Sequence, residues 1–364
     1  LTASYRGAKA EAGRALNILR VKARVLDLQE SRFLEAALQA PGFGQDLAQV
    51  AQAATEAAGD PLKQLELLRK RASGTWFDLV QAYYYTNLLS GVKTHLRNAI
   101  GNSFNVLANT LTPVGGALAD VVRTARTGQP RSVFLGEVPQ NIAGGWVGLH
   151  HGLRNAAFTF SQGFRPSTVE AAASGQFDTP RIELPGGVWT NWPTRALEAA
   201  DEFFRAIGRQ QELYAGAYSQ ARQEGLKTPR EIAGRMATIF TATEPATADA
   251  ALFDTLRARA DAFAARAVFQ EPPGSIVRWL LQAKSPSSPL PLRGAALFLA
   301  PFIRTPAAIL RQGFEASPAG FAMAAARQEG REGAQALGRA VMGTAFLLGA
   351  IAWLAVTNRL TGAP

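Results

Sequence analysis

A run of 19 residues near the C-terminus, from Ala340 to Asn358, carries no charged side chain and constrains this chain more than any other feature. Arg339 and Arg359 close the run at its two ends, and Trp353 lies near the second of them. About 20 helical residues cross the ~30 Å hydrocarbon core of a bilayer, and Trp is typical of the headgroup boundary. The run therefore predicts a membrane-competent helix with its ends marked by Arg339, Trp353 and Arg359.

Local sequence signals elsewhere in the 364 residues favour helices. Apolar positions such as Leu16, Leu19 and Leu26 recur at helical spacing, and Pro61 directly after Asp60 is typical of a helix start. We find no series of alternating strands and no repeat in the range of about 20–50 residues. The expected fold is all-α, an elongated multi-helix assembly with a hydrophobic, membrane-competent C-terminal helix.

Charge is distributed unevenly along the chain, whose formal net charge is +10. The segments 90–166 and 272–364 are strongly basic, whereas 167–271 is acidic, and Pro and Gly interrupt 164–192. These shifts predict four regions: an N-terminal helical region 1–163 that includes a basic segment with uncharged helix at 90–163, an irregular linker 164–192, an acidic helical region 193–283, and a basic, apolar helical region 284–364. Arg supplies most of the cations, which suits phosphate binding but is equally explained by GC-rich coding bias.

The basic segment 90–166 includes an uncharged stretch, Asn98 to Ala119, that contains four regularly spaced asparagines. Their 4-3-4 spacing places all four on one helical face, which is polar and cannot face lipid alone. We interpret this face as a helix contact or as the lining of a wet lumen; its residues are Asn98, Asn102, Asn105 and Asn109. Nearby arginines are candidates for a surface that faces DNA or lipid headgroups: Arg97, Arg123, Arg126, Arg131 and Arg154.

The acidic region contains an apolar stripe on a predicted helix over 194–224. Carboxylates beside it lie three or four positions from arginines, an arrangement typical of solvated helix faces. The stripe is suited to a partner helix, and we take it as a candidate assembly surface: Phe203, Phe204, Ile207, Tyr214 and Tyr218.

Catalytic patterns are weak. Cysteine is absent, so disulfides and thiolate metal sites are excluded. The segment 42–44 reads Gly-Phe-Gly but follows a predicted helix, and Glu30-Ser31 lacks the companion residues of lytic transglycosylases. His150 and His151 are adjacent and would point to different helix faces, and His95 is remote in sequence. We therefore expect no enzyme, no catalytic residue, no cofactor and no metal site.

Four segments, in this order, resemble parts of the large polyvalent and internal virion proteins of bacteriophages. They cover 83–105, 200–221, 301–306 (Pro-Phe-Ile-Arg-Thr-Pro) and 338–364. The resemblance implies a protein stored in the virion, inside the capsid or at the portal or tail, and ejected ahead of the genome. It would then help form a DNA-ejection channel across the host periplasm and inner membrane, as part of a longer polypeptide.

The partners that this resemblance implies are other copies in a homo-oligomeric ring, other ejection proteins, the portal or tail, the host membrane, and the double-stranded DNA passing through. Two alternatives remain. One is a pore-forming or integral membrane helical protein, and the other is a purely structural portal- or tail-associated protein that never meets lipid.

Overall fold

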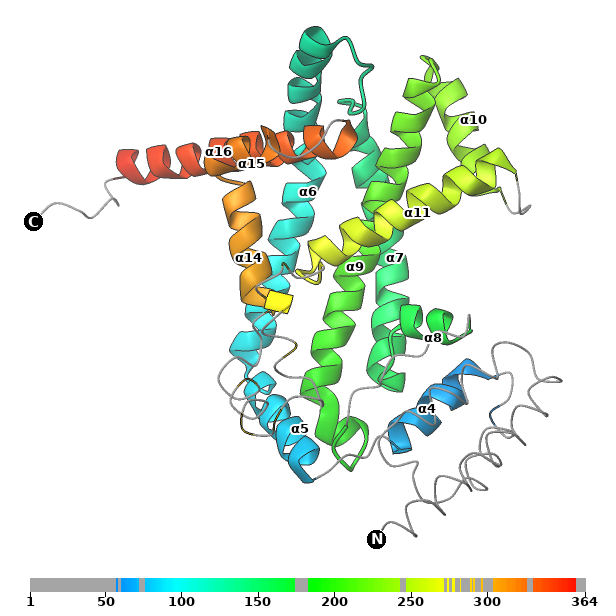
Figure 1. Cartoon of the computed structure of the whole chain (residues 1–364), viewed down its shortest axis with the longest axis vertical. Helices are drawn as coiled ribbons and strands as arrows, with labels where there is room; N and C mark the ends of the chain where they lie inside the picture. The colour runs from blue at the N-terminus through cyan, green and yellow to red at the C-terminus, as the bar shows by residue number, and fades with distance from the viewer. Residues whose placement is uncertain are drawn as a thin grey trace, which may run out of the picture. The chain divides into compact units, whose positions relative to one another are not determined.

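The computed structural model is all-α over the residues that it describes: 57, 60–71, 76–173, 183–242, 247–271, 304–325, 330–357 and isolated positions between 274 and 296. This confirms the predicted fold class (Figure 1). The helices are α4 (Pro61–Arg71), α5 (Trp76–Leu89), α6 (Val92–Thr127), α7 (Glu137–Gln162), α8 (Pro166–Ala173), α9 (Val188–Gln223), α10 (Pro229–Phe240), α11 (Ala248–Ala267), α14 (Arg304–Glu315), α15 (Ala319–Ala325) and α16 (Arg331–Val356).

The chain forms two compact units whose boundaries cut through three of its long helices. Unit 1 comprises residues 1–94 and 157–199, and unit 2 comprises 95–156 and 200–364. The helices α6, α7 and α9 each contribute one end to unit 1 and the remainder to unit 2. These units are defined by contacts between helices, whereas the four regions expected from the sequence are defined by charge and composition along the chain.

The segment expected to be an irregular linker is partly helical. It contains α8, and α9 begins at Val188, with Pro193 inside the helix. Before α9 the chain turns through Gly186 and Gly187, both at positive φ, a conformation that glycine adopts without strain. The buried Asn191 closes this turn, since its amide accepts from the Leu184 N–H at 2.9 Å and donates to the Leu184 and Gly187 carbonyls, each at 2.8 Å.

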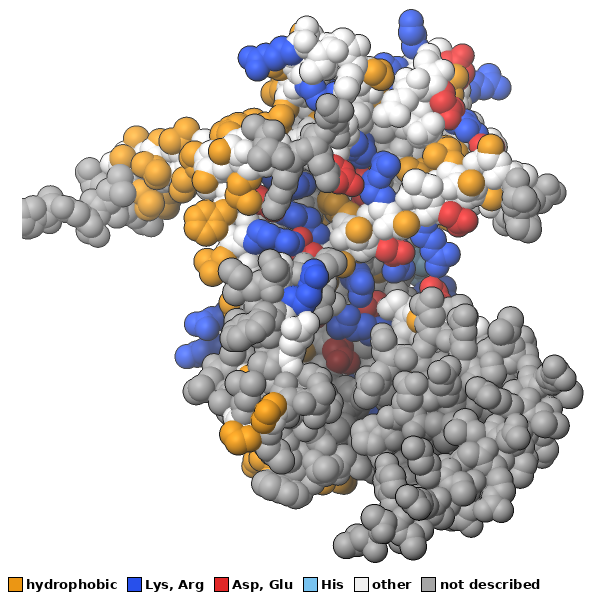
Figure 2. Space-filling view, in the orientation of Figure 1, with side chains coloured by type: hydrophobic (Ala, Val, Ile, Leu, Met, Phe, Trp, Pro, Cys, Tyr) orange, Lys and Arg blue, Asp and Glu red, His pale blue; other side chains and the backbone are white. Residues whose placement is uncertain are grey.

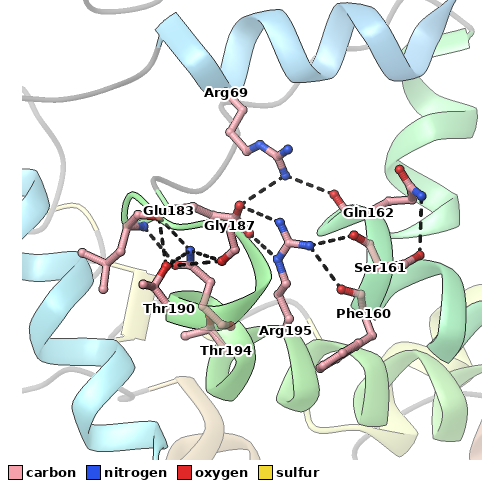
Figure 3. Close-up of polar contacts among 11 residues, drawn as sticks. Arg69, Phe160, Ser161, Gln162, Glu183, Gly187, Thr190, Thr194 and Arg195 are labelled. Carbon is pink, nitrogen blue, oxygen red and sulfur yellow. Dashed lines mark hydrogen bonds and ion pairs between the residues drawn. The ribbon is translucent and has the colours of Figure 1, made fainter.

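In unit 1, two arginines cap the C-terminal end of α7 (Figure 3). Arg195 is buried and forms a bidentate ion pair with Glu183, at 2.9 and 2.8 Å. Arg69 lies 3.3 Å from the same carboxylate. The last carbonyls of a helix have no partner within it, and cations there are favourable. The carbonyl acceptors are Phe160 and Ser161 for Arg195, at 3.2 and 2.8 Å, and Gln162 for Arg69, at 3.1 Å. Glu183 thus holds both capping arginines in place.

In unit 2, α9, α10 and α11 pack around an apolar cluster. Its buried members include Leu213, Ile239 and Leu256, one from each helix. Thr228 begins α10 with a capping box, in which its side chain accepts from the Glu231 N–H and the Glu231 side chain accepts from the Thr228 N–H. The local sequence therefore specifies where α10 turns back onto α9.

Glycines bring α7 and α9 into close contact within unit 2. A Cβ added at Gly148 would lie 2.6 Å from the Ile207 Cα, and one at Gly152 would lie 2.7 Å from the Phe203 carbonyl oxygen. Gly144 makes a similar approach to the backbone of Gln210–Gln211. This i, i+4, i+8 series of small residues is the geometry by which helices also pack in membranes, where bulky side chains are not required to exclude water.

Candidate functional site

Many large apolar side chains of the described residues are exposed, and most of these belong to unit 2. Among all the described residues, 30 large hydrophobic side chains are exposed, whereas 12 apolar residues larger than alanine are buried. The buried set also includes 20 polar or charged residues. A water-soluble monomer seldom exposes extensive apolar surface, so such a surface indicates contact with a partner or a membrane. Figure 2 shows hydrophobic side chains along the end of α16, while charged side chains gather over α9 to α11.

The helix α6 presents its apolar side chains outward. Its exposed residues recur at four- and three-residue spacing, which keeps them on one face of the helix. They are Leu96 (58% exposed), Ile100 (60%), Phe104 (54%), Leu107 (65%) and Leu111 (47%). We call this set the outer stripe of α6. Leu118, Val121 and Val122 extend the exposed apolar surface toward the end of the helix.

The four asparagines lie on the opposite side of α6, and two of them bond to other helices of the chain. Asn98 donates to Asp201 at 3.2 Å, and Asn102, fully buried, donates to the Asn98 side chain at 3.4 Å. Asn105 donates to the Ala267 carbonyl at 2.8 Å and to Gln312 at 3.3 Å. Asn109 is also buried. Of the two interpretations from the sequence, the geometry therefore matches a helix contact, with α9, α11 and α14 as partners.

The short helix α14 has the same inside-out arrangement. Its apolar residues Ile309, Leu310 and Phe314 are exposed, at 48%, 64% and 60%. Its polar side chains turn inward: Arg311 pairs with Glu271, and Gln312 donates to the Arg266 carbonyl at 2.9 Å. The ordinary pattern of a surface helix places charges outward and apolar groups inward. Here the pattern is reversed, as expected if the outer environment is apolar.

The helix α16 is divided into an anchored first half and an uncovered second half. Among the described residues it is the one helix long and apolar enough to cross a membrane by length and composition. From Ala345 to Val356 every residue is exposed or half-buried, and Trp353 and Val356 are 56% and 85% exposed. A helix that is apolar on all sides is stable only when buried in protein or in lipid. Among the described residues Phe104 contacts Phe346, yet no residue from Ala345 to Val356 is buried.

The first half of α16 is held by a buried ion-pair network. Arg331 donates from Nη1 to Glu137 at 2.9 Å, lies 2.8 Å from it through Nη2, and donates from Nε to Glu212 at 3.2 Å. Arg331 also donates to the Ser219 hydroxyl at 2.8 Å, and Gln335 donates to Glu212 at 3.2 Å. All five side chains are buried. The network ties the start of α16 to α7 and α9.

The electrostatics of this network are set by burial. Glu137 is fully buried, and the loss of water around it raises the pKa of its carboxyl group. The Arg331 guanidinium opposes this shift, as do hydrogen bonds from the Ser219 hydroxyl and the Phe134 N–H. Removing Arg331 would therefore leave two carboxylates, Glu137 and Glu212, in a region of low polarity.

Beyond the network, glycines allow α16 to cross α6 at short range. A Cβ at Gly115 would lie 2.7 Å from the Gly338 carbonyl oxygen, and a Cβ at Gly338 would lie 2.5 Å from the Gly116 N. Gly343 approaches the backbone of Ala316 in the turn between α14 and α15. Gly343, one of the two glycines in the uncharged run, thus serves close packing, while Gly349 faces open space.

The structure describes two of the three expected markers of the membrane segment. Arg339 lies within α16, 3.9 Å from Glu315 and with 19% of its side chain exposed, and the helix itself begins at Arg331. Trp353 is exposed in the last turn, and Arg359 lies outside the described residues.

The structure does not gather the five candidate arginines into one patch. Arg97, Arg126 and Arg154 are exposed. Arg123 is instead used within the chain, since it donates to Asp120 at 2.7 Å and to Gln129 at 2.8 Å; Arg131 lies over the Phe134 ring at 5.2 Å. Three of the five are therefore open to a partner.

The five candidate assembly residues on α9 pack within the chain. Ile207 is buried under Gly148, and Phe203 lies against Gly152 and stacks edge-on with Phe204 at 5.0 Å. Tyr214 and Tyr218 pack on the α9–α11 cluster. These five residues are half-buried or buried, whereas exposed large apolar side chains lie on α6, α7, α14 and α16.

A cavity of about 500 Å³ opens beside Tyr214 and Tyr218, between the start of α7 and α10. Its lining is mostly apolar, with Met236 and Phe240 among the larger side chains, and Lys227 is the charged residue that lines it. The lining contains no carboxylate and no histidine, so it holds no acid–base pair. Among the described residues no group of His, Cys, Asp or Glu is arranged to hold a metal ion.

Comparison with known proteins gives no match: no protein-family model fits the chain, and neither a curated protein nor a solved structure is significantly similar to it.

Proposed function

We propose that this chain is a non-enzymatic, membrane-associating helical protein that assembles into a ring and forms part of a phage DNA-ejection channel. The observation that carries the proposal is the inside-out surface of unit 2: apolar on the outside of α6, α14 and the second half of α16, polar where these helices meet the rest of the chain. Such a surface is stable in a bilayer or beneath a partner and unfavourable in water.

The phage assignment rests on the resemblance over 83–105, 200–221, 301–306 and 338–364. The physical properties of the chain are compatible with it. A protein that leaves a capsid through a narrow tail must unfold and refold, and the absence of cysteine means that no disulfide opposes this. The backbone hydrogen bonds within each helix are local in sequence, and isolated helices re-form within about a microsecond.

The ring is proposed because one chain is small compared with a channel for duplex DNA. A duplex-wide channel cannot be enclosed by one copy of a unit built on three long helices, so several copies would surround the DNA. Arg97, Arg126 and Arg154 are exposed cations for phosphate groups of DNA or lipid. The virion is the proposed site of storage, and the host periplasm and inner membrane are the proposed sites of action.

The test uses the chain in vesicles that contain anionic phosphatidylglycerol, loaded with a small dye and with size-graded dextrans. We expect co-flotation with the vesicles and release of both probes. L348R, on the uncovered half of α16, is expected to weaken both, because a cation at the centre of a membrane helix costs about 2.5–3.5 kcal/mol in insertion scales. A258R, on the exposed face of α11, is the matched control and should behave as the wild type.

The alternatives give different results. Release of the small dye alone would support a narrow pore or an ordinary integral membrane protein, and would contradict a DNA-sized channel. No association with vesicles of any composition would support the purely structural portal- or tail-associated role and overturn the membrane proposal.

A further inference from the structure

The outer stripe of α6 is an apolar surface on one face of a long helix. Its five residues are 47–65% exposed. With successive residues turned by about 100°, the stripe and the asparagine face lie roughly on opposite sides of the helix. One side of α6 is thus open and apolar, and the other is polar and occupied by protein.

The charge-free length of α6 matches the thickness of a bilayer. From Asn98 to Ala119 there are 22 residues without charge, which corresponds to about 33 Å of helix and to a hydrocarbon core of ~30 Å. An exposed arginine lies beyond each end of this uncharged stretch. Arg97 and Arg126 are separated by about 44 Å along the helix, close to the ~40–45 Å that includes the headgroups. Their spacing places one cation in each headgroup layer.

The asparagine face explains why α6 does not qualify as a membrane helix by hydropathy. The asparagines lower the mean hydropathy of α6. Two of them, however, are hydrogen-bonded within the chain, to Asp201, the Ala267 carbonyl and Gln312. Polar groups are tolerated at membrane depth when they face protein and not lipid. Pro113 is compatible with the same setting, since prolines occur in membrane helices whose neighbours satisfy the freed backbone groups.

The outer stripe is continuous with the apolar surface of α16. Phe104 contacts Phe346 edge-on, with ring centroids 5.6 Å apart, and both side chains are more than half exposed. One apolar surface therefore extends from α6 onto the uncovered half of α16. That half, Ala345 to Val356, has 12 residues and a length of about 18 Å, which is too short to cross the hydrocarbon core alone.

We propose that α6 crosses the bilayer, with its outer stripe against the lipid chains and Arg97 and Arg126 at the two headgroup layers. The proposal rests on the membrane association proposed above and adds a second, longer membrane element to α16. A second copy of the chain is a weaker candidate for the cover, because it gives no reason for cations spaced by the thickness of a bilayer.

The test exploits the absence of cysteine, which makes every single-cysteine variant a unique labelling site. L96C, L107C and V122C place an environment-sensitive fluorophore at the start, middle and end of the exposed surface of α6. V356C reports on α16, and A258C on α11 is the control outside the proposed lipid contact. Each labelled chain is mixed with phosphatidylglycerol–phosphatidylcholine vesicles that carry bromines either at the bilayer centre or near the headgroups. Circular dichroism checks that each variant is folded.

We expect the label at L107C to be quenched more by central bromines, and those at L96C and V122C more by bromines near the headgroups. The label at A258C should not be quenched. Equal, shallow quenching at all three α6 positions would show a helix lying flat and overturn the proposal. The proposal would also be overturned if, without vesicles, the label at L107C became shielded from water as the protein concentration rises, since a second copy would then cover the stripe. Quenching at V356C without quenching at L107C would refute the role of α6 and leave the membrane association intact. No quenching at either would refute both.

Discussion

Arg331 is the residue whose removal should most destabilise the attachment of α16. Its side chain is buried and lies between two buried carboxylates, Glu137 and Glu212. In R331A both carboxylates stay in the interior without their cation. Glu137 keeps the Ser219 hydroxyl and the Phe134 N–H as donors, and Glu212 keeps Gln335. Removing one partner of a buried pair costs about 3–5 kcal/mol, so we expect a loss of that size in the free energy of unfolding.

The measurement is urea unfolding at pH 7 followed by circular dichroism. R126A removes an exposed cation from the same unit and should change the unfolding free energy by less than about 0.5 kcal/mol. The variant E137Q/E212Q/R331M removes all three charges together and should be clearly more stable than R331A, since no unpaired charge is left buried. A loss of less than about 1 kcal/mol in R331A would refute the network as the anchor of α16.

Three further predictions follow from the packing and charge of unit 2. G148A should destabilise the chain by about 1–3 kcal/mol, because its Cβ would meet the backbone at Ile207. G234A, whose Cβ would lie in open space, should stabilise the chain by up to about 1 kcal/mol. If the melting temperatures of the two variants shift alike, the close approach of α7 and α9 is contradicted. A hydrogen bond from Arg235 holds the pKa of Glu224 below its ordinary value of 4.5, so this pair stabilises the fold above that pH and the effect is lost as pH falls through the folded pKa. E224Q should therefore lower the melting temperature at pH 7 and not at a pH below the folded pKa; an equal effect at both would rule out the ion pair. Finally, R126A should weaken binding to anionic vesicles about fivefold at low salt, since a near-surface cation contributes roughly 1 kcal/mol. R230A on α10 should leave vesicle binding unchanged. The same loss in both variants would mean that net charge, and not the position of Arg126, determines the binding.

Local signals in the sequence predict the fold class well. The helix start at Asp60-Pro61 acts over a few positions, and α4 begins there. The periodic residues Leu16, Leu19 and Leu26 lie outside the described part of the chain. The four asparagines are also recognisable as one face from their spacing alone. Their partners are not, because Asp201 and Gln312 lie 103 and 207 residues away along the chain.

The parts that the sequence does not predict depend on contacts between distant segments. Arg339 closes the uncharged run in the sequence, but Arg331 is the buried anchor, and its partner Glu137 lies 194 residues away. The outer stripe of α6 is visible in the sequence only when the apolar positions are examined apart from the asparagines. Which of the two faces meets protein is decided by tertiary packing, and the polar face does so here.

The central claim is that lipid covers the apolar surface of α6 and α16. A cryo-EM reconstruction of the chain, assembled on anionic vesicles and transferred into lipid nanodiscs, tests it most directly. We predict a ring of several copies in which the outer stripe and the end of α16 lie within the lipid belt, and Asn98 and Asn105 face protein. A particle with no lipid belt, in which the outer stripe is packed against another copy, would contradict the account.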